Sequence, residues 1–141
     1  IKKRGNITKQ KIDLKSRKDF MLGKKIVEDL KKNNVGQAIV VRDSHVIAIE
    51  NQHGTNFMLK KAHKILKKFY NIKKQKGVLI KFPKTNQDLR IDLPTIGIKT
   101  IEQCAKIGLK GIVLKNKYNI VLDKNKLVSF ANKKKMFVTI K

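Results

Sequence analysis

The chain has 141 residues, enough for one domain with a hydrophobic core but not for two domains of ordinary size. Its 35 lysine and arginine residues against 10 aspartate and glutamate residues give a net charge of +25, which favours anionic partners such as phosphates, nucleic acid or an acidic membrane surface. A single cysteine, Cys104, excludes an internal disulfide and favours a reducing cytosol, and no apolar run approaches the ~20 residues that span a bilayer.

The N-terminal part predicts a polar segment, then a helix and two strands. Residues 1–18 are lysine-rich without a sustained period, so we expect a polar linker or the remnant of a preceding domain. From Asp19, which can cap a helix, apolar residues recur on one face as far as Leu30. Residues 37–41 and 45–50 then have the composition of two strands joined by a tight turn.

The clearest predicted helix begins at Gly54–Thr55. Apolar residues recur along one face with helical spacing, and lysines occupy the opposite face, which we expect to be solvated. The apolar face consists of Met58, Ala62, Ile65, Leu66 and Phe69, and the lysine face of Lys60, Lys61, Lys64, Lys67 and Lys68. Residues Gly77–Phe82 follow, and because they open with the apolar run Gly77–Ile80 they predict a strand buried on both faces.

Helices and strands alternate in the C-terminal part. Thr100 and Gln103 have the spacing of a capping box, Gly108 supplies a left-handed stop, and Cys104 between them is predicted to be a small buried residue. The other predicted elements are strands over 111–115 and 119–123 around a short turn, a helix over 124–134 and a strand over 136–140. This order predicts an α/β fold, a single domain over 19–141 with a mixed β-sheet flanked by short helices.

The most informative stretch is KFPKTNQDLRIDLPTIG, residues 81–97, which follows the apolar strand directly. It places Asp88 and Asp92 four residues apart with Arg90 between them, in a chain that has few carboxylates. Open α/β sheets build their sites at the carboxyl ends of strands. Carboxylates can bind Mg²⁺ or orient water, and basic side chains can bind phosphate, so the pattern indicates phosphoryl chemistry. The alternative is that Arg90 only pairs with the aspartates and staples a loop.

A second candidate is ENQHGTN, residues 50–56. Glu50 ends a predicted strand, and Gly54 and Thr55 begin a helix whose free amide groups can receive a phosphate. The alternative is that Thr55 only caps the helix. The three histidines are too scattered in the sequence to predict a metal cluster: His45, His53 and His63.

Several stretches occur in an order typical of one family: GQAIVV, AIE with GT, QD.R.DLPTIG, the T.E..A..GL.GI run and a final MFV. With them the chain resembles the C-terminal domain of the UDP-2,3-diacylglucosamine pyrophosphatases of the LpxI family, from about Asp19 to Lys141, and the QD.R.DLPTIG block is the specific part. The resemblance implies hydrolysis of UDP-2,3-diacylglucosamine to UMP and 2,3-diacylglucosamine 1-phosphate (lipid X) in lipid A biosynthesis. It also implies a divalent metal, Mg²⁺ or Mn²⁺, and a cytoplasmic location, peripheral on the inner membrane of Gram-negative bacteria.

The same resemblance implies roles for particular residues. Asp88 and Asp92 are expected to be catalytic and to bind the metal. The residues expected to bind substrate are Glu50, Gly54, Thr55, Lys81, Lys84, Gln87, Arg90 and Thr95. The expected partners are the lipid-linked UDP-sugar, the N-terminal domain that family members carry, the membrane surface and a second copy in a homodimer. The chain departs from the family at His53 and Asn56, where carboxylates are usual, and at Thr85, where proline is usual.

Two other functions compete with this one. A basic nucleic-acid-binding module fits the charge, but the chain has no tryptophan, only two tyrosines and no glycine-rich RNA motif, so nucleic acid is not the expected partner. A non-catalytic remnant that binds nucleotide with the same fold is favoured by Asn56 and by the absence of the partner domain from this sequence.

Overall fold

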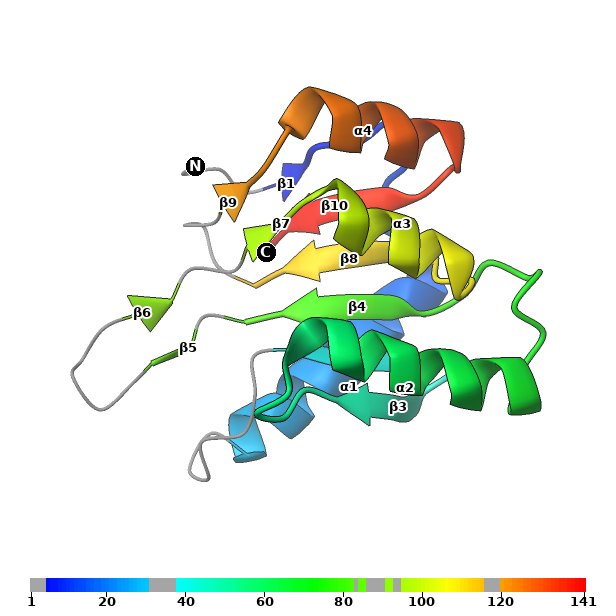
Figure 1. Ribbon diagram of the computed structural model, residues 1–141, viewed down its shortest axis with the longest axis vertical. Coiled ribbons are helices and arrows are strands. Elements are labelled where there is room, and N and C mark those ends of the chain that lie inside the picture. The colour runs from blue at the N-terminus through cyan, green and yellow to red at the C-terminus, as the bar shows by residue number, and fades with distance from the viewer. Residues whose placement is uncertain (1–4, 31–37, 83, 86–90, 93–94, 116–119) are drawn as a thin grey trace.

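A mixed sheet of six strands forms the centre of the molecule, and helices cover both of its faces (Figure 1). The structure is a computed structural model that describes residues 5–30, 38–82, 84–85, 91–92, 95–115 and 120–141. The α/β fold and the mixed sheet predicted from the sequence are confirmed.

Each element has the following bounds. The six strands are β1 (Gly5–Asn6), β2 (Ala38–Arg42), β3 (His45–Ile49), β4 (Val78–Lys81), β8 (Gly111–Leu114) and β10 (Phe137–Ile140). The helices are α1 (Leu14–Leu30), α2 (Gly54–Phe69), α3 (Ile98–Lys106) and α4 (Lys124–Lys133). Two short strand pairs lie beside the sheet: β5 (Lys84–Thr85) with β6 (Ile91–Asp92), and β7 (Thr95–Ile96) with β9 (Ile120–Val121). None of the helices in the described ranges is long and apolar enough to cross a membrane.

The strand directions bring several strand ends to one edge of the sheet. The order is β1-β10-β8-β4-β2-β3, in which β10, β8 and β4 run parallel. Strand β2 is antiparallel to β4, and β3 is antiparallel to β2, so β3 runs in the same direction as β4. The C-terminal ends of strands β3, β4, β8 and β10 therefore all lie at the same end of the sheet. We call this end of the sheet the carboxyl edge.

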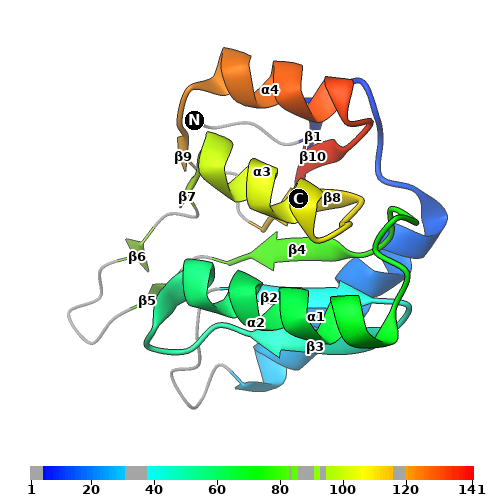
Figure 2. The same cartoon turned by 45° about the vertical axis from the view of Figure 1, so that its right-hand side comes forward.

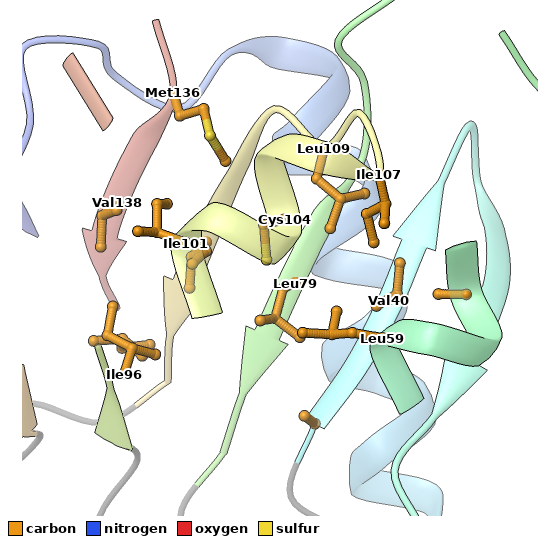
Figure 3. Packing of buried hydrophobic residues seen from close by; sticks show 14 of the residues in the cluster. Val40, Leu59, Leu79, Ile96, Ile101, Cys104, Ile107, Leu109, Met136 and Val138 are labelled. Atoms are coloured by element: carbon orange, nitrogen blue, oxygen red, sulfur yellow. The ribbon is translucent and has the colours of Figure 1, made fainter. Parts of the chain in front are cut away.

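The sheet separates two hydrophobic layers. Helix α1 covers one face, where Phe20 and Val27 pack on Ile39 and Val41 of β2. Helices α2, α3 and α4 cover the opposite face, as Figure 2 shows. On that side Leu59 and Cys104 lie over the sheet residues Val40 and Leu79 (Figure 3). Strand β4 is buried on both faces, as its apolar run predicts. Burial of each of its apolar side chains contributes about 1.5–3 kcal/mol to the stability of the fold.

Helix α1 begins at Leu14, earlier than the predicted start at Asp19. The side chain of Asp13 accepts a hydrogen bond from the Ser16 amide at 2.8 Å, which satisfies a free amide of the first turn. Asp19 is buried inside the helix, and its carboxylate accepts a hydrogen bond at 2.8 Å from the amide of Ser44 in the turn between β2 and β3. Its predicted capping role is therefore wrong, because the side chain ties α1 to the sheet.

Residues 5–18, which fall in the predicted linker, also contact the sheet. Strand β1 pairs with β10, and the Val138 amide donates a hydrogen bond to the Thr8 hydroxyl at 3.0 Å. The Ile7 amide donates to the Val138 carbonyl at the same distance. This segment adds one edge strand and the first turn of α1 to the domain.

One of the two predicted hairpins is confirmed and the other is wrong. Strands β2 and β3 form a hairpin whose turn residues Asp43 and Ser44 have φ values of 50° and 62°, typical of tight hairpin turns. The strand predicted over 119–123 is observed as β9, which pairs in parallel with β7 and not with β8. Strand β8 has no free edge for it, because β4 and β10 occupy both sides.

The start of α3 also differs from the prediction, whereas its end agrees. Helix α3 begins after Gly97, and no side chain in the described ranges caps it, so the predicted capping box of Thr100 and Gln103 is wrong. Gln103 instead hydrogen-bonds to Asn56 of α2. Gly108 has a φ of 82°, which confirms the left-handed stop predicted for this helix.

Candidate functional site

The carboxyl edge gathers five of the residues predicted to bind substrate. Glu50 follows β3, and Lys81 ends β4. Gly54 and Thr55 begin α2, and Thr95 begins β7. Figure 1 shows the ends of β3 and β4 at the side of the sheet where β5, β6 and β7 lie. Residues far apart in the sequence thus meet because the strands that precede them run in the same direction.

Glu50 and Thr55 contact each other directly. The Thr55 hydroxyl donates a hydrogen bond to the Glu50 carboxylate, and the Glu50 amide donates to the Ala38 carbonyl at 2.9 Å. The Glu50 side chain is only 6% exposed. No described side chain caps α2, whose N-cap is His53, so Thr55 is not the simple cap of the alternative interpretation. Its hydroxyl instead fixes the first turn of α2 to the end of β3.

Lys81 is a buried cation at the end of the central strand. Its side chain is 7% exposed, and its Nζ donates a hydrogen bond to the Thr95 carbonyl at 2.6 Å. Burial lowers the pKa of Lys81, and the nearby Glu50 carboxylate opposes this shift. The ammonium therefore lies inside the protein, between the end of the sheet and the strand that leads into α3.

The motif between β4 and β7 is described in part. Strands β5 and β6 pair antiparallel, and their register sets Lys84 opposite Asp92. The backbone thus brings one predicted basic residue and one predicted carboxylate residue together. Gln87, Asp88 and Arg90 lie outside the described residues, and their roles remain predictions.

A pocket of about 560 Å³ adjoins this edge. It lies between the first turn of α2, which contributes Thr55 and Asn56, and α3, which contributes Lys99, Thr100, Glu102, Gln103 and Lys106. Two ammonium groups, two hydroxyls and two amides outweigh one carboxylate, so the lining suits an anionic, hydroxyl-rich ligand. Sequence reasoning missed all of these residues except Thr55 as site residues, because the pocket forms only where two helices distant in sequence lie side by side.

The described histidine, cysteine and carboxylate side chains do not form a metal centre. Within the ranges that the structure describes, no three His, Cys, Asp or Glu side chains come together to hold a metal ion. The His53 ring contacts Phe57, with ring centroids 5.0 Å apart. Cys104 is fully buried, as predicted, and burial raises its pKa to about 12, so its thiol stays protonated and unreactive.

Comparison with known proteins assigns the family. The chain matches the family described as the LpxI C-terminal domain over residues 3–139. The UDP-2,3-diacylglucosamine pyrophosphatase LpxI of Caulobacter vibrioides is 34% identical to it over 114 residues, which are 80% of this chain and 41% of that protein. The chain therefore spans less than half the length of this curated relative. On these matches the chain belongs to the LpxI family, and the match lies in the C-terminal domain of that family.

Proposed function

We propose that this domain forms the catalytic part of a hydrolase that cleaves UDP-2,3-diacylglucosamine to UMP and 2,3-diacylglucosamine 1-phosphate in lipid A biosynthesis. The observation that carries the proposal is the family match over residues 3–139, together with a relative named for this activity. The domain alone is not the whole relative, so the reaction is proposed for the protein that contains it.

The carboxyl edge supports this proposal through its chemistry. The pocket beside Thr55 presents Lys99 and Lys106, which would attract a diphosphate. Its hydroxyl and amide groups would hydrogen-bond to a ribose or a hexose. The motif that carries Asp88 and Arg90 starts at the same edge, directly after β4. The diphosphate and sugar of the substrate would thus be held next to the motif that carries Asp88 and Arg90.

The proposed reaction is a displacement at phosphorus. A water oxygen attacks the UMP-side phosphorus, and the bond from this phosphorus to the bridging oxygen breaks, so the bridging oxygen leaves with the sugar 1-phosphate. Asp88 would orient this water and take up its proton, and Asp92 would assist. Lys84 and Arg90 would neutralise the negative charge on the diphosphate as the bond breaks.

A divalent cation, Mg²⁺ or Mn²⁺, is part of the proposal. The described residues do not by themselves supply a metal site, so the proposal assigns the cation to Asp88 and Asp92. Bound there, it would supply positive charge next to the phosphates. Removing divalent ions with a chelator should abolish UMP release, and adding back Mg²⁺ or Mn²⁺ should restore it.

The test is a direct assay of UMP release from UDP-2,3-diacylglucosamine. The variants Asp88→Asn and Asp92→Asn should each lower the rate by at least about a hundredfold. Asp29→Asn is the matched control, because Asp29 is an exposed carboxylate on α1 far along the chain from the motif. Equal activity in the wild type and in both motif variants would refute the roles proposed for the aspartates.

The assay should be run on this domain alone and again after adding the part of the Caulobacter vibrioides protein that lies outside the match. Because the relative extends well beyond the matched part, we propose that an additional domain completes the site. The domain alone should then bind UMP but release little of it from substrate, and adding the remainder of the relative should raise the rate. Binding of UMP without turnover under both conditions would favour the non-catalytic remnant. Binding of RNA or DNA with a steep salt dependence would favour the nucleic-acid module.

We also propose a contact between the lysine face of α2 and an acidic lipid surface. All five lysines of this face are exposed, and so are Phe57 at 47% and Phe69 at 69%. Each lysine close to an anionic leaflet contributes about 1 kcal/mol, and exposed aromatic rings can enter the interface. Sedimentation with vesicles tests this: binding should require anionic lipid and should fall when Lys60, Lys64 and Lys67 are replaced by glutamine. Equal binding to neutral vesicles would contradict it.

A further inference from the structure

Glu50 and Lys81 lie in one row across three neighbouring strands. Lys81 is the register partner of Ala38, and Glu50 continues the β3 register on the other side of Ala38. Residues opposite each other in antiparallel pairs point to the same face of the sheet. The residue between them in this row, Ala38, has only a methyl group as its side chain, so the sheet itself places no bulky side chain between Glu50 and Lys81.

Glu50 and Lys81 are each hydrogen-bonded to a segment that leads to a different wall of the pocket. Glu50 accepts a hydrogen bond from Thr55, which belongs to α2 and lines the pocket. Lys81 donates to the Thr95 carbonyl, and Thr95 is followed through Gly97 by α3, which forms the opposite wall. Both side chains are buried, at 6% and 7% exposure, so solvent competes little for either bond.

We propose that Glu50 and Lys81 form a buried bridge that sets the spacing between the two helix starts lining the pocket, and that Lys81 is a positioning residue for β7. The ammonium of Lys81 is directed at the Thr95 carbonyl and not at solvent, where a diphosphate would have to reach it. This replaces the substrate contact predicted for Lys81. In its consequence for catalysis, the inference rests on the proposed function.

Amide hydrogen exchange tests the bridge without any need for activity. The Leu122 amide donates to the Ile96 carbonyl at 2.9 Å, so it reports whether β7 stays in place. The Met136 amide, which donates to the Ala131 carbonyl at 2.8 Å, is the reference. In Lys81→Met, exchange at Leu122 should rise roughly tenfold relative to Met136, because a charge-assisted hydrogen bond to the neighbouring residue is lost. Lys61→Met, on an exposed position of α2, is the matched control and should change neither amide.

The double variant Lys81→Met/Glu50→Gln separates a tether from a simple balance of charge. It removes the negative charge of Glu50, which the single variant leaves buried without the Lys81 ammonium nearby. If Lys81 holds β7, exchange at Leu122 stays fast in the double variant. Recovery of wild-type exchange there would overturn the proposal, as would equal acceleration at both amides or no change at Leu122 in the single variant.

Kinetics then distinguish positioning from contact with substrate. If the proposed function holds, Lys81→Met should lower kcat about tenfold and leave KM within about twofold, because the site is misplaced while its contacts persist. A rise in KM with unchanged kcat would identify Lys81 as a substrate ligand and overturn the positioning role. If every variant, the wild type included, fails to release UMP even with the remaining part of the relative present, the proposed function is refuted and the exchange result stays intact.

Discussion

Replacing Thr55 by valine isolates the hydrogen bond that joins α2 to the end of β3. Valine keeps the branched shape of threonine but cannot donate to the Glu50 carboxylate. A buried acceptor that loses its donor costs about 1–3 kcal/mol, and bonds to charged groups lie in the upper part of that range. Because Glu50 keeps the attraction of Lys81, we expect about 1–2 kcal/mol, which lowers the midpoint of thermal unfolding by roughly 2–8 °C for a chain of this size.

Urea unfolding of four variants measures this contribution. Thr55→Ser keeps the hydroxyl and should stay close to the wild type, whereas Thr55→Val should lose the full amount. Glu50→Met removes the acceptor, and this variant, alone and combined with Thr55→Val, completes a double-mutant cycle in which the coupling free energy should be at least about 0.5 kcal/mol. If Thr55→Val is as stable as Thr55→Ser, or if the two changes add without coupling, the hydroxyl does not hold Glu50 and the reasoning is refuted.

Four further predictions concern buried groups and the backbone. Because burial raises the pKa of Cys104 to about 12, the folded protein should not react with a disulfide reagent near neutral pH, and one thiol should react after denaturation; fast labelling of the folded protein would contradict this. The same shift means that the folded state keeps this proton longer than the unfolded chain, so stability should fall in alkali between pH 9.0 and about pH 12, and Cys104→Ala should lack that loss. Burial lowers the pKa of Lys81 below its ordinary value of 10.5, so the folded state releases that proton first; the stability of the wild type relative to Lys81→Met should therefore rise from neutral pH towards pH 10.5, and a flat or falling difference in urea unfolding would contradict it. Gly108→Ala should cost about 1–2 kcal/mol for its left-handed backbone, and more because its new Cβ would lie 2.3 Å from the Ile72 carbonyl oxygen; Gly54→Ala, with a φ of 90° and open space around it, should show the backbone cost alone, and equal losses in the two variants would show that the contact with Ile72 relaxes freely.

Local sequence patterns predicted most of the fold because the strongest patterns report burial. The run Val78–Ile80 of β4 is apolar at every position, and the structure buries it on both faces. The β2–β3 hairpin needed only a short turn between two apolar runs. The pairing of β9 depended instead on which strand edges were already occupied, and that is decided by β10, which comes later in the chain. Periodicity carries no information about such competition between distant segments.

The candidate site was predictable where the sequence marks a strand end and hidden where two elements meet. Glu50 and Lys81 were predicted because each ends an apolar run, and Thr95 because of the family resemblance; the structure brings the three to one end of the sheet, and their roles in binding remain predictions. Their burial could not be predicted, because it depends on α2 and α3 closing over the end of the sheet. The polar residues Thr100 and Gln103 matched a capping pattern, yet in the structure they line a pocket. One polar spacing can serve a helix end or a ligand, and only the packing of the helices decides which.

The neighbouring positions of β1 and β10 constrain how the protein can be made. Strand β10 is the last described strand to leave the ribosome, and it fills the gap between β1 and β8. Until then, β8 is paired only with β4, and its other side is open. Such an open edge can pair with a strand from another molecule. Residues 137–140 therefore complete the pairing of the sheet, and a chain whose synthesis stalls shortly before them should be prone to aggregate.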